Sequence, residues 1–348
     1  MDIYYGNDEN ERKHKILFKE IIKVISERKY KLPETIIIYG SFSRYEGNWD
    51  MDDNIINDID LIFIDKKSYG KFIHHIKIDL KNKLGCKFVD ITLFTKKQFK
   101  KLKKSIFSYD LYQHGKVLHG DLNLEELQFS KELIPLKDVE ILFRTRLWTF
   151  IGSYPRKGLV GLSVLDREVF NYQLCKAIFA CIDCLSVLKK EYNSSYKDKI
   201  IWAKNQQELL TYLDLIHFAE DLKLNGNLSN NSAPISLIQR VAKMFEENFS
   251  LGLKLFFNSK KKLIDIVTKQ YDSSLRACLM KNLYFLKKRD GYKIFNLIVI
   301  QYLIFHYLYL DDEIGLKRII AYSKKLKIKS NDVQTIRCTV AELRLVEL

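Results

Sequence analysis

Three aspartates in apolar, strand-like surroundings are the residues whose type and spacing indicate chemistry. Asp58 and Asp60 open the run DIDLIFI, and Asp90 interrupts the run FVDITLF. Alternate side chains of a strand share a face, so Asp58 and Asp60 point the same way, with Cα atoms about 6.5 Å apart. Carboxylates held that close repel each other and resist desolvation, and a divalent cation relieves both penalties. Their hard oxygen atoms suit Mg²⁺ or Mn²⁺.

The strand that carries Asp90 is expected to pair beside DIDLIFI, which brings Asp90 to the same metal site. Carboxylates from two adjacent strands meet the needs of two-metal phosphoryl transfer. In that chemistry one ion activates an attacking hydroxyl and the other holds a triphosphate and its leaving pyrophosphate. Asp90 is then the carboxylate expected to act on the acceptor hydroxyl.

A turn ahead of these aspartates supplies groups for phosphate. Gly40 and Ser41 follow the short strand pattern at 36–39, and Ser43 comes two residues after Ser41. Glycine lets the backbone approach a phosphate closely, and turn N–H groups with the Ser41 hydroxyl can hold phosphate oxygens. The spacing from this turn to DID and then to the lone strand aspartate makes the combination informative.

The pattern GS, then NDIDL, then a strand aspartate resembles the DNA polymerase β-like nucleotidyltransferase superfamily. The nearest likeness is to the minimal and kanamycin-type nucleotidyltransferases, over about residues 34–95. The resemblance implies that Asp58, Asp60 and Asp90 are the metal-binding carboxylates. It also implies that Gly40 and Ser41 grip the triphosphate, and that a helical domain follows the catalytic one.

Two departures from the family pattern bear on substrate class. Ser43 and Arg44 are kept and are expected at the nucleotide, but Tyr45 stands where glycine is common. The acidic loop at 46–57 is longer than in minimal members and contains a second DxD at 50–52. That loop also has calcium-loop spacing, but Ile55 and Leu61 occupy the positions that need glycine and glutamate.

A basic group from the helical region is expected at the nucleotide phosphates. Lys176 interrupts an apolar helical pattern within a turn of Asn171 and Tyr172, and it is the first candidate. Arg144 and Arg146 are alternatives. A lysine whose stem crosses an apolar surface to reach solvent is the competing interpretation of Lys176.

Lysines gather at 96–104, in a pattern that predicts a helix over 96–105. They could bind a nucleic-acid backbone, although a solvated helix face is the simpler explanation. His114 and His119 flank a possible short strand around KVLHG and are interpreted as structural. Cys181 and Cys184 have CxxC spacing inside an apolar helical pattern, which favours reduced core thiols over a zinc site.

The composition is that of a globular protein with a polyanionic partner or a lysine-rich background. Of 348 residues, 47% are hydrophobic, and 58 Lys and Arg against 43 Asp and Glu give a formal net charge of +15. The polar start lacks a signal-peptide core, and the apolar stretch 294–310 contains Asn296, Gln301 and His306. We therefore expect a buried helix there, no membrane association and a cytoplasmic location.

The element pattern predicts an α+β protein in which a small mixed-sheet domain precedes a larger all-α domain. Strands are expected at 36–39, 58–64 and 87–94, and the domains at 1–130 and 131–348. The last stretch, VQTIRCTVAELRLVEL, fits a strand or a helix. Helices are expected at 11–29, 67–84, 138–152, 166–191, 207–223, 235–248, 261–286 and 292–310.

These observations predict a Mg²⁺- or Mn²⁺-dependent nucleotidyltransferase that moves NMP from an NTP to an acceptor hydroxyl or phosphate and releases pyrophosphate. RNA, protein and small-molecule acceptors remain open, and the net charge of +15 leans toward nucleic acid. The alternative is a non-catalytic nucleotide- or RNA-binding or regulatory protein on the same fold.

Overall fold

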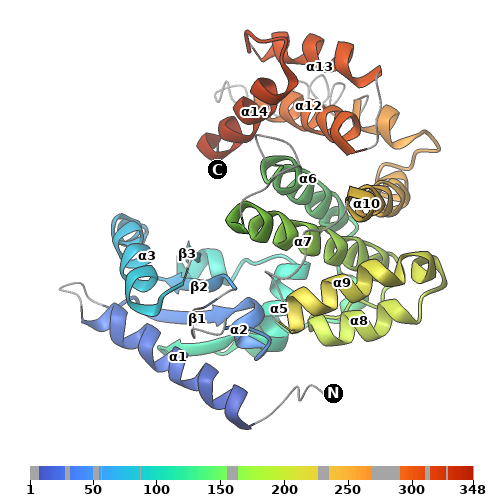
Figure 1. The fold of residues 1–348 in the computed structure, drawn as a ribbon. Coiled ribbons are helices and arrows are strands. Elements are labelled where there is room, and N and C mark those ends of the chain that lie inside the picture. The colour runs from blue at the N-terminus through green and yellow to red at the C-terminus, as the bar shows by residue number, and fades with distance from the viewer. Residues whose placement is uncertain are drawn as a thin grey trace. The chain divides into compact units, whose positions relative to one another are not determined.

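The chain folds into two compact units, which Figure 1 shows together. The computed structural model describes residues 8–27, 32–49, 55, 57–86, 88–154, 164–225, 235–268, 291–309, 314–326 and 328–347. Unit 1 consists of Met1–Pro135, Tyr192–Ile201 and Lys223–Gly226. Unit 2 consists of Leu136–Glu191, Trp202–Leu222 and Asn227–Leu348.

Unit 1 is built on a mixed four-stranded sheet with the order β3-β2-β1-β4. The strands are β1 Thr35–Tyr39, β2 Ile59–Ile64, β3 Val89–Phe94 and β4 Lys116–His119. β1 runs antiparallel to both β2 and β4, whereas β2 and β3 are parallel. A mixed sheet was predicted, and the possible strand around KVLHG is β4, an edge strand paired with β1.

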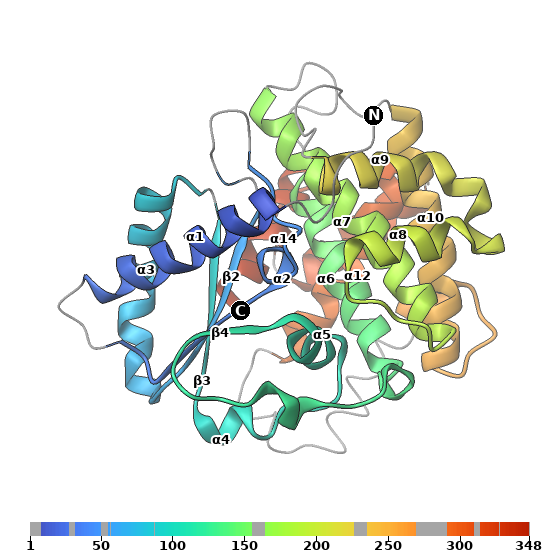
Figure 2. The same cartoon turned by 90° about the horizontal axis from the view of Figure 1, so that it is seen from below.

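One face of the sheet is covered by α1 (Asp8–Ser26) and α3 (Gly70–Leu84), and Figure 2 shows both on the side of the sheet away from α5 (Ile106–His114). Their apolar stripes pack with Ile36, Ile38 and Leu61 of the sheet. α3 follows the short helix η1 (Lys67–Tyr69) and ends at Gly85 in the left-handed conformation, φ 64°, which glycine adopts without strain.

The other face carries the second apolar cluster, which joins Ile37, Ile62 and Ile64 to Phe99 and Leu111. The predicted helix over 96–105 is wrong, because this stretch forms only the one-turn helix α4 (Lys96–Phe99) and a turn before α5. Capping boxes at Thr95 and Ser105 start the two helices separately, since each side chain accepts the N3 backbone N–H. The short helices η2 and η3 span Leu124–Leu127 and Lys131–Leu133.

The described part of unit 2 is helical and contains no strand. α8 (Tyr196–Lys204) begins in unit 1 and ends in unit 2, as the residue ranges of the units show. α8 and α13 were not predicted, and the ambiguous final stretch is helix α14. The bounds are α6 Lys137–Gly152, α7 Val164–Leu188, η4 Gln207–Tyr212, α9 Leu213–Leu224, α10 Ile235–Phe256, α12 Gly291–Tyr309, α13 Ile314–Lys325 and α14 Val333–Glu347. Of the predicted helix 261–286, residues beyond 268 lie outside the described ranges.

Aromatic side chains make the core of unit 2. Phe150 stacks on Phe245, and Phe143 lies against Phe245, Phe249 and Tyr302. In the described residues one helical stretch, 167–188 of α7, is long and apolar enough to cross a membrane. However, 78% of its apolar window is buried inside the protein, as expected of a core helix. α12 covers most of the apolar stretch 294–310, and its described side chains at 298–305 are buried.

The two units do not follow a single cut in the sequence. Unit 1 extends to Pro135 and also takes in 192–201 and 223–226, which come from far beyond residue 130. No composition shift or turn signal in the sequence marks these segments as partners of the sheet. The predicted domains, 1–130 and 131–348, stay a prediction.

Candidate functional site

Tyr39, Asp60 and Asp90 form a row across three neighbouring strands of the sheet. Tyr39 of β1 is the antiparallel partner of Asp60 in β2, and Asp60 is the parallel partner of Asp90 in β3. Asp58 precedes β2 and lies two residues from Asp60, so an extended backbone directs it to the same face. The sequence correctly predicted that the strands of Asp60 and Asp90 are neighbours. We call Tyr39, Asp58, Asp60 and Asp90 the carboxylate row.

Gly40 brings the turn after β1 against this row. Its φ is +75°, and a Cβ added there would lie 2.4 Å from Oδ2 of Asp60. Any side chain would therefore meet the Asp60 carboxylate and would also strain the left-handed backbone. The short helix α2 (Gly40–Ser43) starts at this point, so the predicted phosphate turn and the predicted metal ligand touch.

The pKa of the Tyr39 hydroxyl reflects the negative charge of the neighbouring aspartates. Burial raises the pKa of the Tyr39 hydroxyl, and the negative charges of Asp60, Asp90 and Asp58 raise it further, against a hydrogen bond with Thr92. The phenol therefore stays protonated throughout the physiological range. Its ring packs edge-to-face on Phe107 of α5, with centroids 5.5 Å apart, which fixes the side chain beside the carboxylates.

The donor chemistry of the row fits a divalent cation, but the side chains are not gathered around one point. Asp90 is 63% exposed, and its Oδ1 lies 3.0 Å from Nζ of Lys77 on α3. Among the described residues no three His, Cys, Asp or Glu side chains stand close enough together to hold a metal ion. Asp58 and Asp60 fit the ion as oxygen donors, and Asp90 has to leave Lys77 to join them.

The serines of the turn are buried and shape its backbone. Ser43 Oγ donates a hydrogen bond of 2.9 Å to the Gly40 carbonyl. The carbonyl of Ser41 accepts the N–H groups of Arg44 and Glu46, at 3.2 and 2.9 Å. In the structure the Ser43 hydroxyl is bonded to the backbone of the turn, and its predicted contact with a nucleotide stays a prediction.

Arg44 is the predicted nucleotide contact whose position differs most from the expectation. Its guanidinium lies inside unit 1, where Nε is 2.7 Å from Oε2 of Glu46 and the group stacks 4.7 Å from the ring centroid of Tyr196. The exposed fractions of the Arg44 and Glu46 side chains are only 5% and 9%. Arg44 therefore makes an internal ion pair in this structure.

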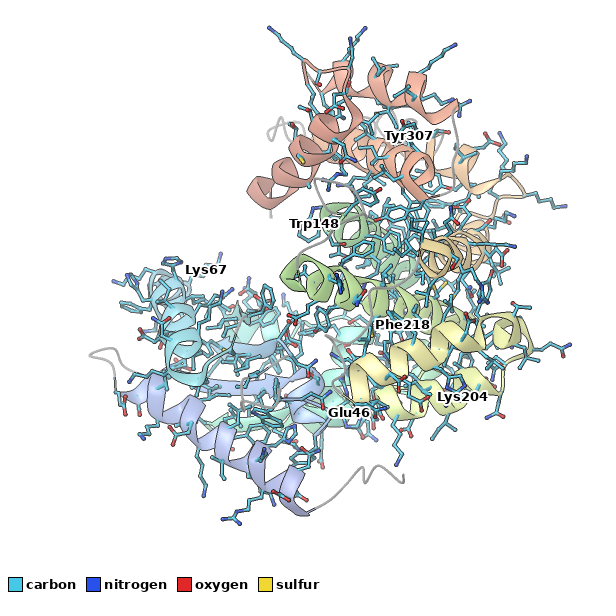
Figure 3. All side chains as sticks on the ribbon, viewed as in Figure 1. Glu46, Lys67, Trp148, Lys204, Phe218 and Tyr307 are labelled. Atoms are coloured by element: carbon cyan, nitrogen blue, oxygen red, sulfur yellow. The ribbon has the colours of Figure 1, made fainter. Side chains whose placement is uncertain are left out.

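The segment 192–201 completes the surroundings of this ion pair, and the sequence did not predict it. Glu46, labelled in Figure 3, accepts hydrogen bonds from the Ser195 hydroxyl at 2.8 Å and the Lys197 backbone N–H at 3.2 Å. Burial alone would raise the pKa of Glu46, but the charge of Arg44 and hydrogen bonds from Arg44, Ser195 and the Tyr196 backbone hold it below its ordinary value. We call Arg44, Glu46 and Ser195 the turn clamp.

Two further contacts attach the same segment to α5. The Tyr192 hydroxyl donates to the carboxylate of Asp110 at 3.0 Å. His114 Nε2 lies 2.7 Å from the Ser194 hydroxyl. Burial and then the charge of Arg44 lower the pKa of His114 to about 4, so this imidazole is neutral at neutral pH. The polar run NSSYK at 193–197 was the sequence signal, but nothing in it names a partner.

Tyr45, the departure from the family pattern, has a positive φ of 60°. A glycine would adopt this conformation freely, which explains its frequency at this position in the resembling family. Here the ring gives a compensating contact, since it packs edge-to-face on His14 of α1 with centroids 5.4 Å apart. Lys116 Nζ lies 4.6 Å from the same ring.

The predicted basic groups of the helical region belong to unit 2. Lys176 is half-buried, with Nζ 4.4 Å from the ring centroid of Tyr172 one turn earlier. Arg144, the alternative, pairs with Glu140 through Nε and Oε1 at 2.7 Å. Whether Lys176, Arg144 or Arg146 reaches a nucleotide stays a prediction.

The remaining candidates of the sequence either lie outside the described residues or are in the core. The second DxD and the calcium-like spacing fall on 50–54, which the structure does not describe, and Trp49 and Ile55 bridge the two sides of that loop. Cys181 and Cys184 are buried thiols, and burial raises the pKa of both.

Comparison with known proteins adds no family to this description. No family model matches the chain, and no curated protein or solved structure matches it either. The proposal below therefore depends on the sequence motifs and on the geometry of unit 1.

Proposed function

We propose that the protein is a metal-dependent nucleotidyltransferase, which moves NMP from an NTP to an acceptor and releases pyrophosphate. The observation that carries the proposal is the alignment of Gly40 with the carboxylate row. A phosphate-binding type of turn touches Asp60, and Asp90 is in register with Asp60 on the next strand. Carboxylate oxygens gathered at neighbouring strand ends are the ligands that Mg²⁺ and Mn²⁺ prefer, and like charges held close together favour a bound cation.

Each residue of the row has a role in the proposal. Asp58 and Asp60 would hold Mg²⁺ or Mn²⁺, which neutralises triphosphate charge when bound. The first N–H groups of a helix lack intrahelical partners, so those of α2 would donate hydrogen bonds to phosphate oxygens, and Gly40 keeps side-chain bulk away from them. The protonated Tyr39 hydroxyl can donate a hydrogen bond beside the carboxylates.

Asp90 would take the proton of the acceptor hydroxyl, once its carboxylate leaves Lys77. The ion pair between Lys77 and Asp90 is also the observation that favours a second candidate function, that of a non-catalytic nucleotide- or RNA-binding protein. A carboxylate that stays paired with a lysine neither binds a metal ion nor acts as a base. The release of Asp90 from Lys77 therefore distinguishes the two functions.

The finer organisation is also part of the proposal. We assign the nucleotidyltransferase domain to residues 1–130 and a helical domain to 131–348, which offers Lys176 to the phosphates. Ser41 stays in the proposed phosphate turn through its backbone, whereas Ser43 and Arg44 support that turn from behind. We also propose a cytoplasmic location, on sequence features alone.

The test is transfer of label from each α-labelled NTP, with Mg²⁺, to total RNA, total protein or a small-molecule extract. The double variant Asp58→Asn, Asp60→Asn should lose transfer by about a thousand-fold or more, because both oxygen donors of the cation lose their charge. The exposed Asp121 of unit 1 supplies the control, and Asp121→Asn should transfer like the wild type. Full Mg²⁺-dependent pyrophosphate release by the double variant would refute the proposal.

A further inference from the structure

A dense group of lysines lies on unit 1 between β3 and α5. Lysine occupies six of the nine positions 96–104, whereas Lys and Arg together make up 58 of the 348 residues of the chain. No aspartate or glutamate occurs from Ile91 to Tyr109. The sequence left a solvated helix face as the simpler explanation, but the stretch is not one helix.

Five of these lysines are exposed and lack an acidic partner in the described part of the chain. Lys96 pairs with Glu34, with Nζ and Oε2 2.7 Å apart. The other five have no carboxylate within 4.0 Å among the described residues. We call these five the lysine patch: Lys97, Lys100, Lys101, Lys103 and Lys104. Like charges this close destabilise the chain unless an anion approaches them.

The backbone under the lysine patch is held in place. Phe99 is buried and Leu102 half-buried in the apolar cluster of Ile62, Ile64 and Leu111, so the two apolar side chains point inward between the lysines. Thr95 and Ser105 cap the helices on either side. The positive charges are therefore presented by a fixed loop, which reduces the conformational entropy lost when an anion binds.

The loop that carries the lysine patch packs on the same face of the sheet as the carboxylate row. Asp60, Ile62 and Ile64 alternate along β2, and Phe99 packs on Phe94 at the far end of β3, with ring centroids 6.2 Å apart. Asp90 and Phe94 are four residues apart, about 13 Å along the strand. A stacked nucleic-acid strand covers that distance in about four nucleotides.

We propose that the lysine patch binds the phosphate backbone of a single-stranded nucleic-acid acceptor, upstream of the end that reaches the carboxylate row. The acceptor role rests on the proposed nucleotidyl transfer, whereas the binding itself does not. The one aromatic residue of 96–104, Phe99, is 4% exposed and cannot stack on a base. Recognition by this surface is therefore of phosphates and is independent of base sequence.

Binding is measured on the full chain with labelled oligo-uridylate and oligo-thymidylate, in EDTA and without NTP. Single-stranded binding loses about 0.7 log units of affinity per log unit of salt for each phosphate contact. Five contacts predict a fall of about a hundred-fold in affinity between about 50 and about 200 mM salt. RNA and DNA should both bind, and a preference for one identifies the acceptor class.

The patch variant replaces its five lysines with Gln and should lose most of the affinity and most of the salt dependence. A matched control removes the same charge from exposed lysines on the opposite face of the sheet, and it should bind within about twofold of the wild type. A third variant with Arg at the five patch positions should keep binding. The control lysines, on α1 and α3, are Lys19, Lys23, Lys71, Lys81 and Lys83.

Equal weakening in the patch and control variants would show that binding follows net charge, and wild-type affinity in the patch variant would exclude the surface altogether. Either result overturns the inference. Thermal unfolding shows whether each variant is folded. If the Gln variant does not fold, the Arg variant still tests the inference, because it keeps the five positive charges and should keep binding. Nucleic-acid binding that is lost with the patch, in a chain that transfers no NMP, would instead refute only the proposed function.

Discussion

The carboxylate row and the turn clamp are both groups of charged side chains in unit 1, but they differ in the signs of their charges and in their exposure. The clamp joins opposite charges, Arg44 and Glu46, whose side chains are 5% and 9% exposed and bond within the protein. The row gathers like charges, and its outermost member, Asp90, is 63% exposed. The clamp needs nothing further from outside, whereas the row gains from a cation.

This difference distinguishes residues that stabilise the turn from residues proposed to bind the cation, within one short stretch of sequence. Arg44 was a candidate because it is charged and follows the GS turn, yet its bond with Glu46 helps to hold that turn in place. Asp58 and Asp60 were conspicuous because apolar residues surround them. A buried ion pair is strongly destabilised when one partner is removed, whereas like charges held close together repel each other and favour a bound cation. Four experiments test this division.

Glu46→Ala should have the largest effect on stability. It leaves the Arg44 guanidinium buried without its partner, which costs about 3–5 kcal/mol of unfolding free energy. Urea unfolding followed by circular dichroism measures this loss. The control is Glu27→Ala, which breaks an exposed pair with Lys83 on the same unit and should cost no more than about 1 kcal/mol. A loss from Glu46→Ala as small as that of the control would contradict the assigned role of the clamp.

Gly40→Ala should reduce transfer by about a hundred-fold, with a stability loss of about 1–2 kcal/mol from the left-handed backbone. The added Cβ would meet the Asp60 carboxylate, so the turn and the row must move apart. Gly70→Ala is the matched control, since its Cβ would meet only Leu93 at an ordinary 3.6 Å. Unchanged transfer by Gly40→Ala would show that the turn and Asp60 do not act together.

Stability should fall with acid between pH 6.5 and about 4, because the folded chain holds the pKa of His114 at about 4 rather than 6.5. The unfolded chain binds this proton first, so the contribution of His114 is present above pH 6.5 and is lost through this window. Glu46 adds to the loss at lower pH, since its pKa is also lowered. Unfolding measured across pH should show a flatter slope for His114→Gln. The exposed His75→Gln is the control, and an equal change in both variants would remove His114 as the cause.

Lys77→Met should have the smallest effect on stability, within about 1 kcal/mol, since an exposed ion pair contributes little. The variant is informative because it removes the lysine that competes with a metal ion for the Asp90 carboxylate. If Asp90 is a metal ligand, Mn²⁺ should bind a few-fold more tightly, as measured by electron paramagnetic resonance without nucleotide. Lys83→Met, which breaks the ion pair of α3 with Glu27, should leave Mn²⁺ binding unchanged. Equal Mn²⁺ affinity in both variants would favour the non-catalytic alternative.

The strands and the row were the part of the fold that the sequence predicted well. Short β-branched runs bounded by glycine and polar residues fixed β1, β2 and β3 within about two residues. The pattern failed at 96–105, where one helix was predicted, because the caps at Thr95 and Ser105 outweigh the helical spacing. Ser43 and Arg44 were placed at the nucleotide by resemblance, and only the tertiary structure gave them internal partners.

The sequence by itself determined that Asp60 and Asp90 stand in strands and that a glycine turn precedes them, because strand periodicity and turn chemistry are local properties, whereas Asp58, also predicted in a strand, precedes β2. The tertiary structure alone decided that Asp60 and Asp90 are in register, that Gly40 touches Asp60 and that Lys77 pairs with Asp90. It also brought Ser195 to Glu46 across 149 positions of the chain. Contacts between distant segments depend on how strands pair and helices pack, and no local pattern in the chain encodes them.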